Sequence, residues 1–247
     1  MTSGRYVMKD HAGSSHQVIL RLLEDVPRDA RVLDVGVATG YLDREMKARG
    51  LHVTGIERDV GSAEQARPFC DELLIGDVEA LDLSAWAGNH DVIVLADVLE
   101  HLKDPAAALA KVLATARPGA RVIACVPNVA NVYVRLNLLA GRFQYAPRGI
   151  LDATHLRFFT RRTFIGLIEA AGLRITELRA TPIPLPEAFP RSAGSWWIRL
   201  GMWLLRAVTP MCKGLLAYQF VIAAEKPNAV TSPSSAGKQR EIVGVSH

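Results

Sequence analysis

Short runs of β-branched and other apolar residues alternate with amphipathic segments along most of the 247-residue chain. This alternation is typical of a parallel β-sheet covered by helices, because consecutive parallel strands need a crossover between them. We predict strands at 31–35, 52–56, 72–75, 91–96, 120–126, 174–181 and 217–225, and helices at 15–25, 41–49, 106–115 and 162–171. Gly50 and Gly172 stand just past two of these helices, where glycine commonly ends a helix. The expected fold class is α/β, with a doubly wound, mostly parallel sheet.

Two segments interrupt the alternation. Residues 128–160 follow one predicted strand directly, and residues 182–216 separate the last two strands. We interpret both as insertions that form a substrate pocket or a lid. The length favours one domain, over 1–226. The polar tail 227–247, rich in Ser, Gly and Lys, is expected to be disordered.

The composition indicates the cellular compartment and the kinds of partner that we expect. The chain is 49% apolar and 22% charged, as in an ordinary globular protein. Cys70, Cys125 and Cys212 lie far apart without metal-ligand spacing, which indicates reduced thiols and a cytoplasmic setting. The first 16 residues lack an apolar segment, so no secretory signal is expected. The net charge of +4 permits an anionic acceptor, but the dispersed basic residues argue against DNA and RNA partners.

The first predicted strand runs into a glycine-rich turn, Asp34-Val-Gly-Val-Ala-Thr-Gly40. Glycines let such a turn approach a ligand closely, and ligands of open α/β sheets bind at the carboxyl ends of the strands. The spacing GxAxG differs from the GxGxxG fingerprint, which argues against a nicotinamide-dependent dehydrogenase. A tight turn that binds no ligand is the alternative interpretation.

Acidic residues follow the next two predicted strands as well. Glu57 ends the second strand, where a carboxylate can accept hydrogen bonds from two ribose hydroxyls. Asp77 follows the third strand and is placed to bind an adenine amino group. Ala96 and Asp97 end the fourth strand. Each acid alone could simply terminate a strand, but the ordered set indicates a nucleoside site.

The motifs VLDVGVATGYL, GIERD, GDVEALDL and LADVLEHLKDP resemble class I S-adenosylmethionine-dependent methyltransferases. The bacterial branch of glycan-associated and ubiquinone-pathway O-methyltransferases is the most similar, over about residues 6–182. The resemblance implies a seven-stranded sheet of order 3-2-1-4-5-7-6 with an antiparallel last strand. It implies S-adenosylmethionine as cofactor, with S-adenosylhomocysteine as product. The implied cofactor-binding residues are Asp34, Gly36, Val37, Ala38, Gly40, Glu57, Arg58, Asp77, Val78 and Ala96. Ala38 departs from the family, which usually has glycine there, and we expect it to be tolerated at a negative φ.

Four residues are candidates for the chemistry: Asp97, Glu100, His101 and His155. The first three would project from one side if the chain turned helical after the fourth strand. Histidine titrates near neutrality, so either histidine could act as a general base. In related methyltransferases the matching motif binds a divalent metal, so these four residues are the metal candidates, with Zn²⁺ or Mn²⁺ better suited than Mg²⁺. We predict that metal is absent; a merely capping role of Glu100 and His101 is the third interpretation.

The resemblance makes His16 a wall of the substrate pocket, while Ser14 before it could be only a helix N-cap. Arg148 and Arg157 lie in the first insertion among several arginines, which bind phosphate or carboxylate well. These three residues are our substrate candidates, and solvated surface charge is the alternative for the arginines.

Residues 195–208 (SWWIRLGMWLLRAV) are strongly apolar and contain three tryptophans. Two arginines and the following Pro210 argue against a membrane span, which needs about 20 apolar residues. Such a helix could lie in a membrane interface. It could equally cover the pocket or form a homodimer contact.

The favoured function is O-methylation of a sugar, a glycolipid precursor or a small natural product. A small-RNA or N-methyltransferase of the same fold is the nearest alternative. The alternatives of another class are a nicotinamide-dependent dehydrogenase and a non-catalytic partner with this fold.

Overall fold

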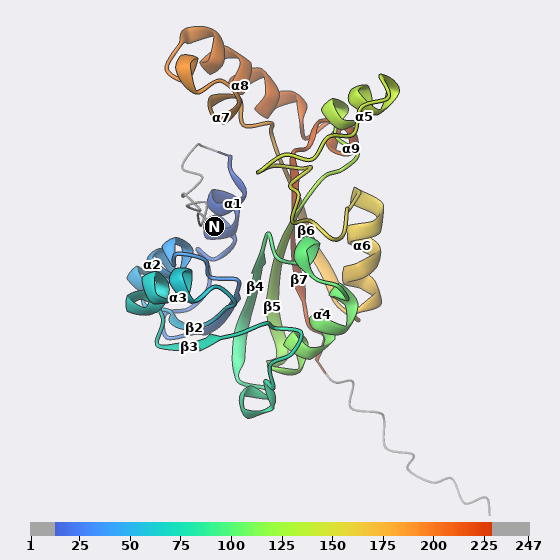
Figure 1. The fold of residues 1–247 in the computed structure, drawn as a ribbon. Helices are drawn as coiled ribbons and strands as arrows, with labels where there is room; N and C mark the ends of the chain where they lie inside the picture. Colours follow the sequence, from blue (N-terminus) through green and yellow to red (C-terminus); the bar gives the residue numbers. More distant parts are fainter. Residues whose placement is uncertain (1–12, 229–247) are drawn as a thin grey trace, which may run out of the picture.

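Seven strands form one sheet of order β3-β2-β1-β4-β5-β7-β6 in the computed structural model, which describes residues 13–228 (Figure 1). Neighbours from β3 to β5 are parallel, and β7 is antiparallel to both β5 and β6. The implied order and the antiparallel last strand are therefore confirmed. The strands are β1 Arg31–Val35, β2 His52–Glu57, β3 Glu72–Ile75, β4 His90–Ala96, β5 Ala116–Pro127, β6 Arg174–Thr181 and β7 Gln219–Glu225.

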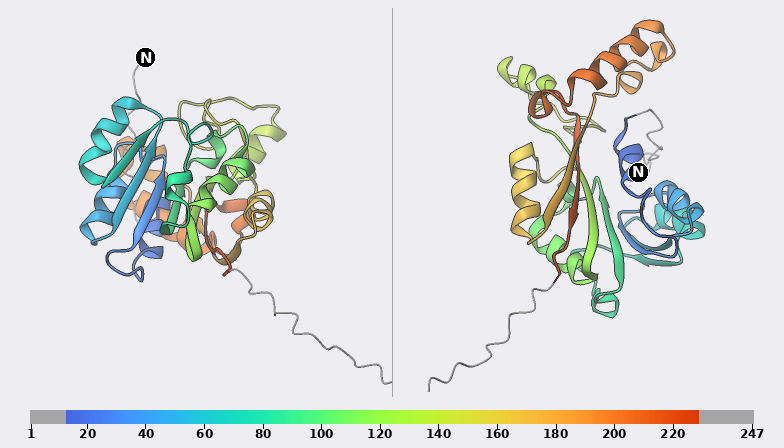
Figure 2. Two further views of the ribbon diagram at one scale, coloured as in Figure 1. Left: turned by 90° about the horizontal axis from the view of Figure 1, so that it is seen from below. Right: turned by 180° about the vertical axis from the view of Figure 1, so that it is seen from behind.

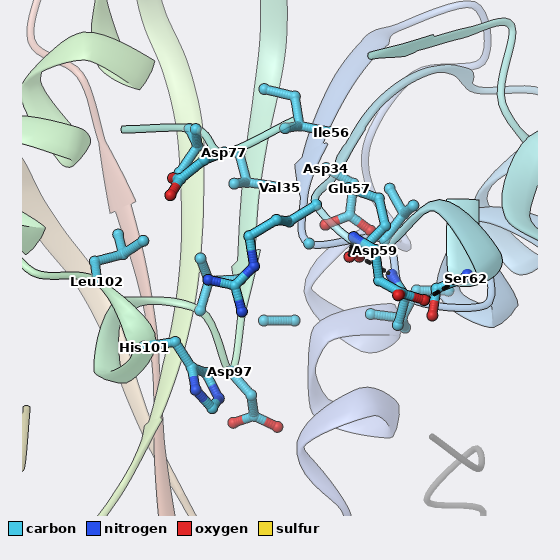
Figure 3. A pocket seen from close by; sticks show the side chains of 18 of the residues that line it. Asp34, Val35, Ile56, Glu57, Asp59, Ser62, Asp77, Asp97, His101 and Leu102 are labelled. Carbon is cyan, nitrogen blue, oxygen red and sulfur yellow. Dashed lines mark hydrogen bonds between the residues drawn. The ribbon is translucent and has the colours of Figure 1, made fainter. Parts of the chain in front are cut away.

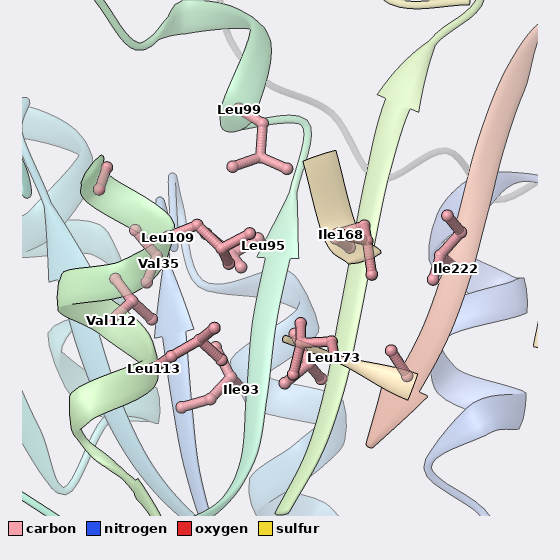
Figure 4. Close-up of a cluster of buried hydrophobic side chains, with 14 of the residues drawn as sticks. Val35, Ile93, Leu95, Leu99, Leu109, Val112, Leu113, Ile168, Leu173 and Ile222 are labelled. Carbon is pink, nitrogen blue, oxygen red and sulfur yellow. The ribbon is translucent and has the colours of Figure 1, made fainter. Parts of the chain in front are cut away.

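Helices cover both faces of this sheet (Figures 1 and 2). They are α1 Ser15–Leu22, α2 Tyr41–Ala48, α3 Val60–Ala66, α4 Pro105–Ala114, α5 Val132–Leu139, α6 Arg161–Ala170, α7 Leu185–Ala188, α8 Trp196–Val208 and α9 Lys213–Leu216. Alternate residues of β4 point to opposite faces, as expected of a strand. Ile93 and Leu95 join the apolar core under α4 and α6 (Figure 4), whereas Val92 and Val94 join the core under α1 and α2.

The boundaries differ from prediction in a few places. Helix α3 was not predicted, because its seven residues include a glycine and no apolar periodicity; its signal is Asp59, whose carboxylate accepts the Ser62 N–H at 2.8 Å. Strand β5 begins at Ala116, four residues earlier than predicted. The Pro118-Gly119 pair resembled a turn, but it lies within the strand near a register irregularity. Strand β7 begins at Gln219 rather than at 217.

Both insertions lie beyond the carboxyl ends of the parallel strands (Figure 1). The first contains α5, and the second contains α7, α8 and α9. Two buried asparagines of the first insertion bind the residue that directly follows the second: the side-chain amides of Asn128 and Asn131 donate to the Ala217 carbonyl at 2.9 and 2.8 Å. Among residues 13–228, no helix is long and apolar enough to cross a bilayer. Nearly all of the tail 227–247 lies outside the described residues.

Candidate active site

A cavity of about 390 Å³ opens at the carboxyl ends of β1, β2 and β4 (Figure 3). Its volume lies within the ~300–1,000 Å³ of small-molecule sites. The predicted residues that line it are His16, Asp34, Gly36, Val37, Ala38, Glu57, Arg58, Asp77, Val78, Ala96, Asp97 and His101. Five predicted residues do not line it: Gly40, Glu100, Arg148, His155 and Arg157. The topology thus gathers strand-end residues that are far apart in sequence into one crevice.

The glycine turn needs left-handed backbone at several positions. Gly36 has φ +80°, and an added Cβ there would meet Val98 Cγ2 at 2.7 Å. Gly40 has φ +77°, and its Cβ would meet the Ala66 Cα at 2.7 Å. Gly40 therefore allows α2 to begin against α3 and contributes no wall to the cavity.

The expectation of a negative φ at Ala38 is wrong, since its φ is +48°. The turn requires this conformation because the Ala38 N–H points at Glu57 and donates to its Oε2 at 2.9 Å. A left-handed conformation costs a non-glycine residue about 1–2 kcal/mol. The glycine usual in the family would avoid that cost.

The carboxylates at the strand ends organise their own turns. Glu57 accepts the Asp59 N–H on Oε1 at 2.8 Å, in addition to the Ala38 N–H on Oε2. Asp77 Oδ1 accepts the Glu79 N–H at 2.9 Å. A carboxylate oxygen has two lone pairs, so these groups retain acceptor capacity toward the crevice.

Asp34 and Asp43 form a buried acidic pair beneath the crevice. Burial raises the pKa of the Asp34 carboxyl well above its usual range, and the neighbouring Asp43 raises it further. Burial also raises the pKa of Asp43, to about 7. The pair therefore holds a proton at neutral pH, and Asp34 is the member of it that lines the cavity.

Tyr41 is a wall residue that sequence reasoning missed. Its hydroxyl is hydrogen-bonded to His16 Nε2, and the two rings lie 4.6 Å apart. Burial raises the pKa of Tyr41, with smaller contributions from Asp97 and Asp34. The Ser14 hydroxyl caps α1 by accepting the Gln17 N–H at 3.3 Å, which holds His16 on the first turn. The available signal was an aromatic residue directly after the glycine turn.

Asp97, Glu100 and His101 do not share one regular α-helix. Asp97 adopts φ +56°, and the 3₁₀ turn that follows covers only Leu99–His101. Asp97 Oδ1 accepts hydrogen bonds from the Gln219 amide at 2.5 Å and the Cys125 thiol at 3.1 Å. Asp97 therefore lies outside the group that could bind a metal.

Glu100, His101 and His155 do come together, each offering a donor atom within 4.8 Å of the others. His101 and His155 have ring centroids 4.8 Å apart. His101 Nδ1 lies 3.2 Å from the Thr154 carbonyl, and His155 Nδ1 lies 3.1 Å from the Ile150 carbonyl. Because a carbonyl only accepts, both Nδ1 atoms carry the proton and both Nε2 atoms keep a lone pair.

Burial lowers the pKa of His155, and the neighbouring His101 lowers it further. His155 is therefore neutral at physiological pH, the form that accepts a proton or binds a metal. The insertion is held over the crevice by its backbone, because the Leu156 and Arg157 N–H groups both donate to the Glu100 carbonyl, at 2.8 and 2.9 Å. The Arg157 guanidinium donates to the Lys103 carbonyl instead of pointing into the cavity.

These features fit an adenosyl sulfonium cofactor. Glu57 and Asp77 offer acceptors at neighbouring strand ends, where a nucleoside presents its hydroxyl and amino donors. Ile56, Val78 and Leu102 supply apolar walls for a base. Asp34 adds a buried carboxyl group to the lining of the same cavity.

Comparison with known proteins agrees with this geometry. A family model described as "Methyltransferase domain" matches residues 9–178. The ubiquinone biosynthesis O-methyltransferase of Aeromonas salmonicida is 31% identical over 159 residues, which are 60% of this chain and 64% of that protein. The enzyme of the same name from Aromatoleum aromaticum is 30% identical, over 66% of this chain and 74% of that one. The chain thus spans less than two thirds of the Aeromonas protein.

Solved structures share the fold at low sequence identity. A methyltransferase from Bacillus halodurans superposes with a TM-score of 0.60 at 16% identity, over 87% of this chain and all of that one. Phosphoethanolamine N-methyltransferase 2 of Haemonchus contortus, solved with S-adenosyl-L-methionine, gives a TM-score of 0.60 at 14% identity, over 86% of this chain and 52% of that one. By fold, by family match and by the residues at its strand ends, the chain belongs to the methyltransferase domain family.

Proposed function

We propose that this protein transfers the methyl group of S-adenosylmethionine to a hydroxyl group of a small acceptor, with His101 as general base. The observation that carries the proposal is the position of His101 in the same crevice as Asp34, Glu57 and Asp77. The names of the two O-methyltransferase relatives support oxygen as the methyl acceptor. Sugars, glycolipid precursors and small natural products are the acceptor classes we favour.

Each residue has a defined task in this reaction. The cofactor supplies an electrophilic methyl group, so the protein mainly aligns the reactants, excludes water and removes a proton. Glu57 and Asp77 would hold the nucleoside by accepting hydrogen bonds from it. The Thr154 carbonyl fixes the proton of His101 on Nδ1, so His101 Nε2 can accept the hydroxyl proton. A positioned base of this kind typically contributes about 10²–10⁴-fold to the rate.

Three measurements test the proposal. Calorimetric titration should show binding of S-adenosylmethionine and S-adenosylhomocysteine but not of NAD; failure to bind either at millimolar concentration would overturn the assignment. A labelled-methyl screen against hydroxyl-bearing glycans and small molecules should then identify the acceptor. With that acceptor, His101→Gln should lower kcat about 10²–10⁴-fold and leave S-adenosylhomocysteine affinity within about threefold; an unchanged kcat would exclude His101 as the base.

A metal-assisted form of the same reaction is the second candidate. It is favoured by the approach of Glu100, His101 and His155 to one another. Two imidazoles and one carboxylate suit Zn²⁺ or Mn²⁺ better than Mg²⁺. Activity lost on chelation and restored by added metal would support this candidate. Activity that survives chelation would support His101 as a general base without a metal.

A further inference from the structure

The two insertions lie at the end of the molecule to which the parallel strands point (Figures 1 and 2). Both of them expose apolar side chains. In α5, Leu136 and Leu139 are 60% and 84% exposed. In α8, Trp196 and Trp203 are 75% and 64% exposed. Exposed tryptophans and leucines grouped in this way mark an interaction site, whereas single ones do not.

Helix α8 is apolar on two sides. Ile198 and Met202 are buried toward the protein, and Gly201 sits against Leu185 of α7. The outward side carries Trp196, Leu200, Trp203 and Leu204, at the spacings of a single helical stripe. A helix that is apolar on both sides is normally buried on both, so the outward stripe of α8 requires a partner.

Charge identifies the kind of partner. Residues 129–149 and 188–217, which contain α5, α8 and α9, carry seven Arg or Lys and no Asp or Glu. The rest of the chain holds 22 of the 29 basic residues and all 25 acidic ones, a net charge of −3. The net positive charge of the protein therefore lies in the same segments as the exposed tryptophans of α8 and the exposed leucines of α5 and α8.

We propose that α5 and α8, with their flanking residues, form a docking surface for an anionic lipid bilayer. Tryptophan and leucine on one side of a helix, with Arg or Lys beside them, are typical of helices that lie in the headgroup region. The 13 residues of α8 span about 20 Å, which suits a helix lying in the plane of the membrane. A symmetric contact between two copies would instead bring the same cations together without carboxylates to pair them.

Vesicle flotation of the full chain tests this surface. We expect the protein to float with vesicles of three parts phosphatidylcholine to one part phosphatidylglycerol and to remain behind with phosphatidylcholine alone. Raising NaCl from 0.1 to 0.5 M should weaken the binding, because salt screens the attraction to anionic headgroups. A failure of the wild-type protein to float with the anionic vesicles would overturn the proposal.

Matched variants separate the apolar and the electrostatic contributions. The double variant Trp196→Ser/Trp203→Ser should bind at least about tenfold more weakly, and Val60→Ser, which changes an exposed valine on α3, should bind like wild type. Arg142→Gln/Arg199→Gln should weaken binding about 25-fold, since each cation near an anionic surface contributes about fivefold; Arg44→Gln on α2 is the charge control. Far-ultraviolet circular dichroism and the melting temperature verify folding.

Two further results would overturn the proposal. One is flotation of the tryptophan variant, folded by those criteria, to the same extent as wild type. The other is a wild-type dimer in sedimentation velocity that the tryptophan substitutions convert to a monomer, because the outward stripe would then face a second copy. None of these readouts depends on methyl transfer, so they stand apart from a test of the enzymatic proposal.

Discussion

The crevice and the insertions are built by contrasting means. In the crevice, turns directly after the strands hold each acidic side chain: Glu57 is fixed by two backbone N–H groups and Asp77 by one. In the insertions, α5 and α8 leave large apolar side chains in solvent. The site proposed for the cofactor is therefore organised by internal hydrogen bonds, whereas the outer face of the insertions leaves large apolar side chains without such partners inside the described part of the chain.

Among the tests of this contrast between crevice and insertions, the largest effect is expected from Glu57→Gln. The amide retains one acceptor oxygen but presents an NH₂ group to the second backbone N–H, and it removes the charge. Since a hydrogen bond to a charged group contributes about 1.5–3 kcal/mol, we expect S-adenosylhomocysteine affinity to fall about 100-fold. Calorimetry is the measurement, and Glu64→Gln on the exposed side of α3 is the control. A loss below threefold would mean that the crevice is not preorganised by Glu57.

A second, intermediate effect is expected from Asp43→Asn. The pKa of Asp43 rises from 3.8 to about 7 on folding. Between these two pH values the folded protein therefore keeps a proton that the unfolded chain has lost. The associated stability is present below pH 4 and is lost as the pH rises through 7. The variant should thus melt roughly 4–8 °C higher than wild type at pH 8, equivalent to about 2 kcal/mol. Thermal denaturation from pH 5 to 8 is the measurement. If the variant raised the melting temperature equally at pH 5 and at pH 8, the proton shared by Asp34 and Asp43 would be contradicted.

Ala38→Gly should have a smaller, stabilising effect. Relief of the left-handed conformation should stabilise the folded protein by about 1–2 kcal/mol. The greater conformational freedom of glycine in the unfolded chain offsets about 0.4–1 kcal/mol of this. We expect the melting temperature to rise by roughly 1–4 °C. Ala107→Gly, at an exposed helical position of α4, should lower it instead. If both substitutions lowered it equally, Ala38 would not be strained.

The smallest effect is expected from Leu139→Ser in α5. An exposed side chain without buried contacts contributes within about ±0.5 kcal/mol to stability, so both the melting temperature and S-adenosylhomocysteine affinity should stay at the wild-type values. Thermal denaturation and calorimetry measure these two quantities. A clear destabilisation would show that the insertion packs as part of the core, and the contrast between the two regions would fail.

The parallel sheet and its strand ends could be predicted from sequence because both depend on local patterns. Apolar runs between amphipathic segments located all seven strands, and acids at or just past the strand ends located Asp34, Glu57 and Asp77. The strand order was implied by the resemblance rather than by periodicity.

What sequence could not predict depends on contacts between distant segments. The φ of Ala38 follows from its N–H reaching Glu57, 19 residues away. The direction of Asp97 follows from Gln219, which lies 122 residues later. The pairing of His101 with His155 was only conjectured from sequence, because it depends on how the first insertion folds back.

The Glu100 carbonyl has a consequence for how acceptor preference can change. It accepts the N–H groups of Leu156 and Arg157 in the first insertion. Glu100 directly precedes His101 in the chain, and Leu156 directly follows His155. This attachment involves only main-chain atoms, so substitutions elsewhere in the insertion can reshape the space offered to an acceptor without separating the two imidazoles. New specificities could therefore evolve on this scaffold while the histidine pair is inherited intact.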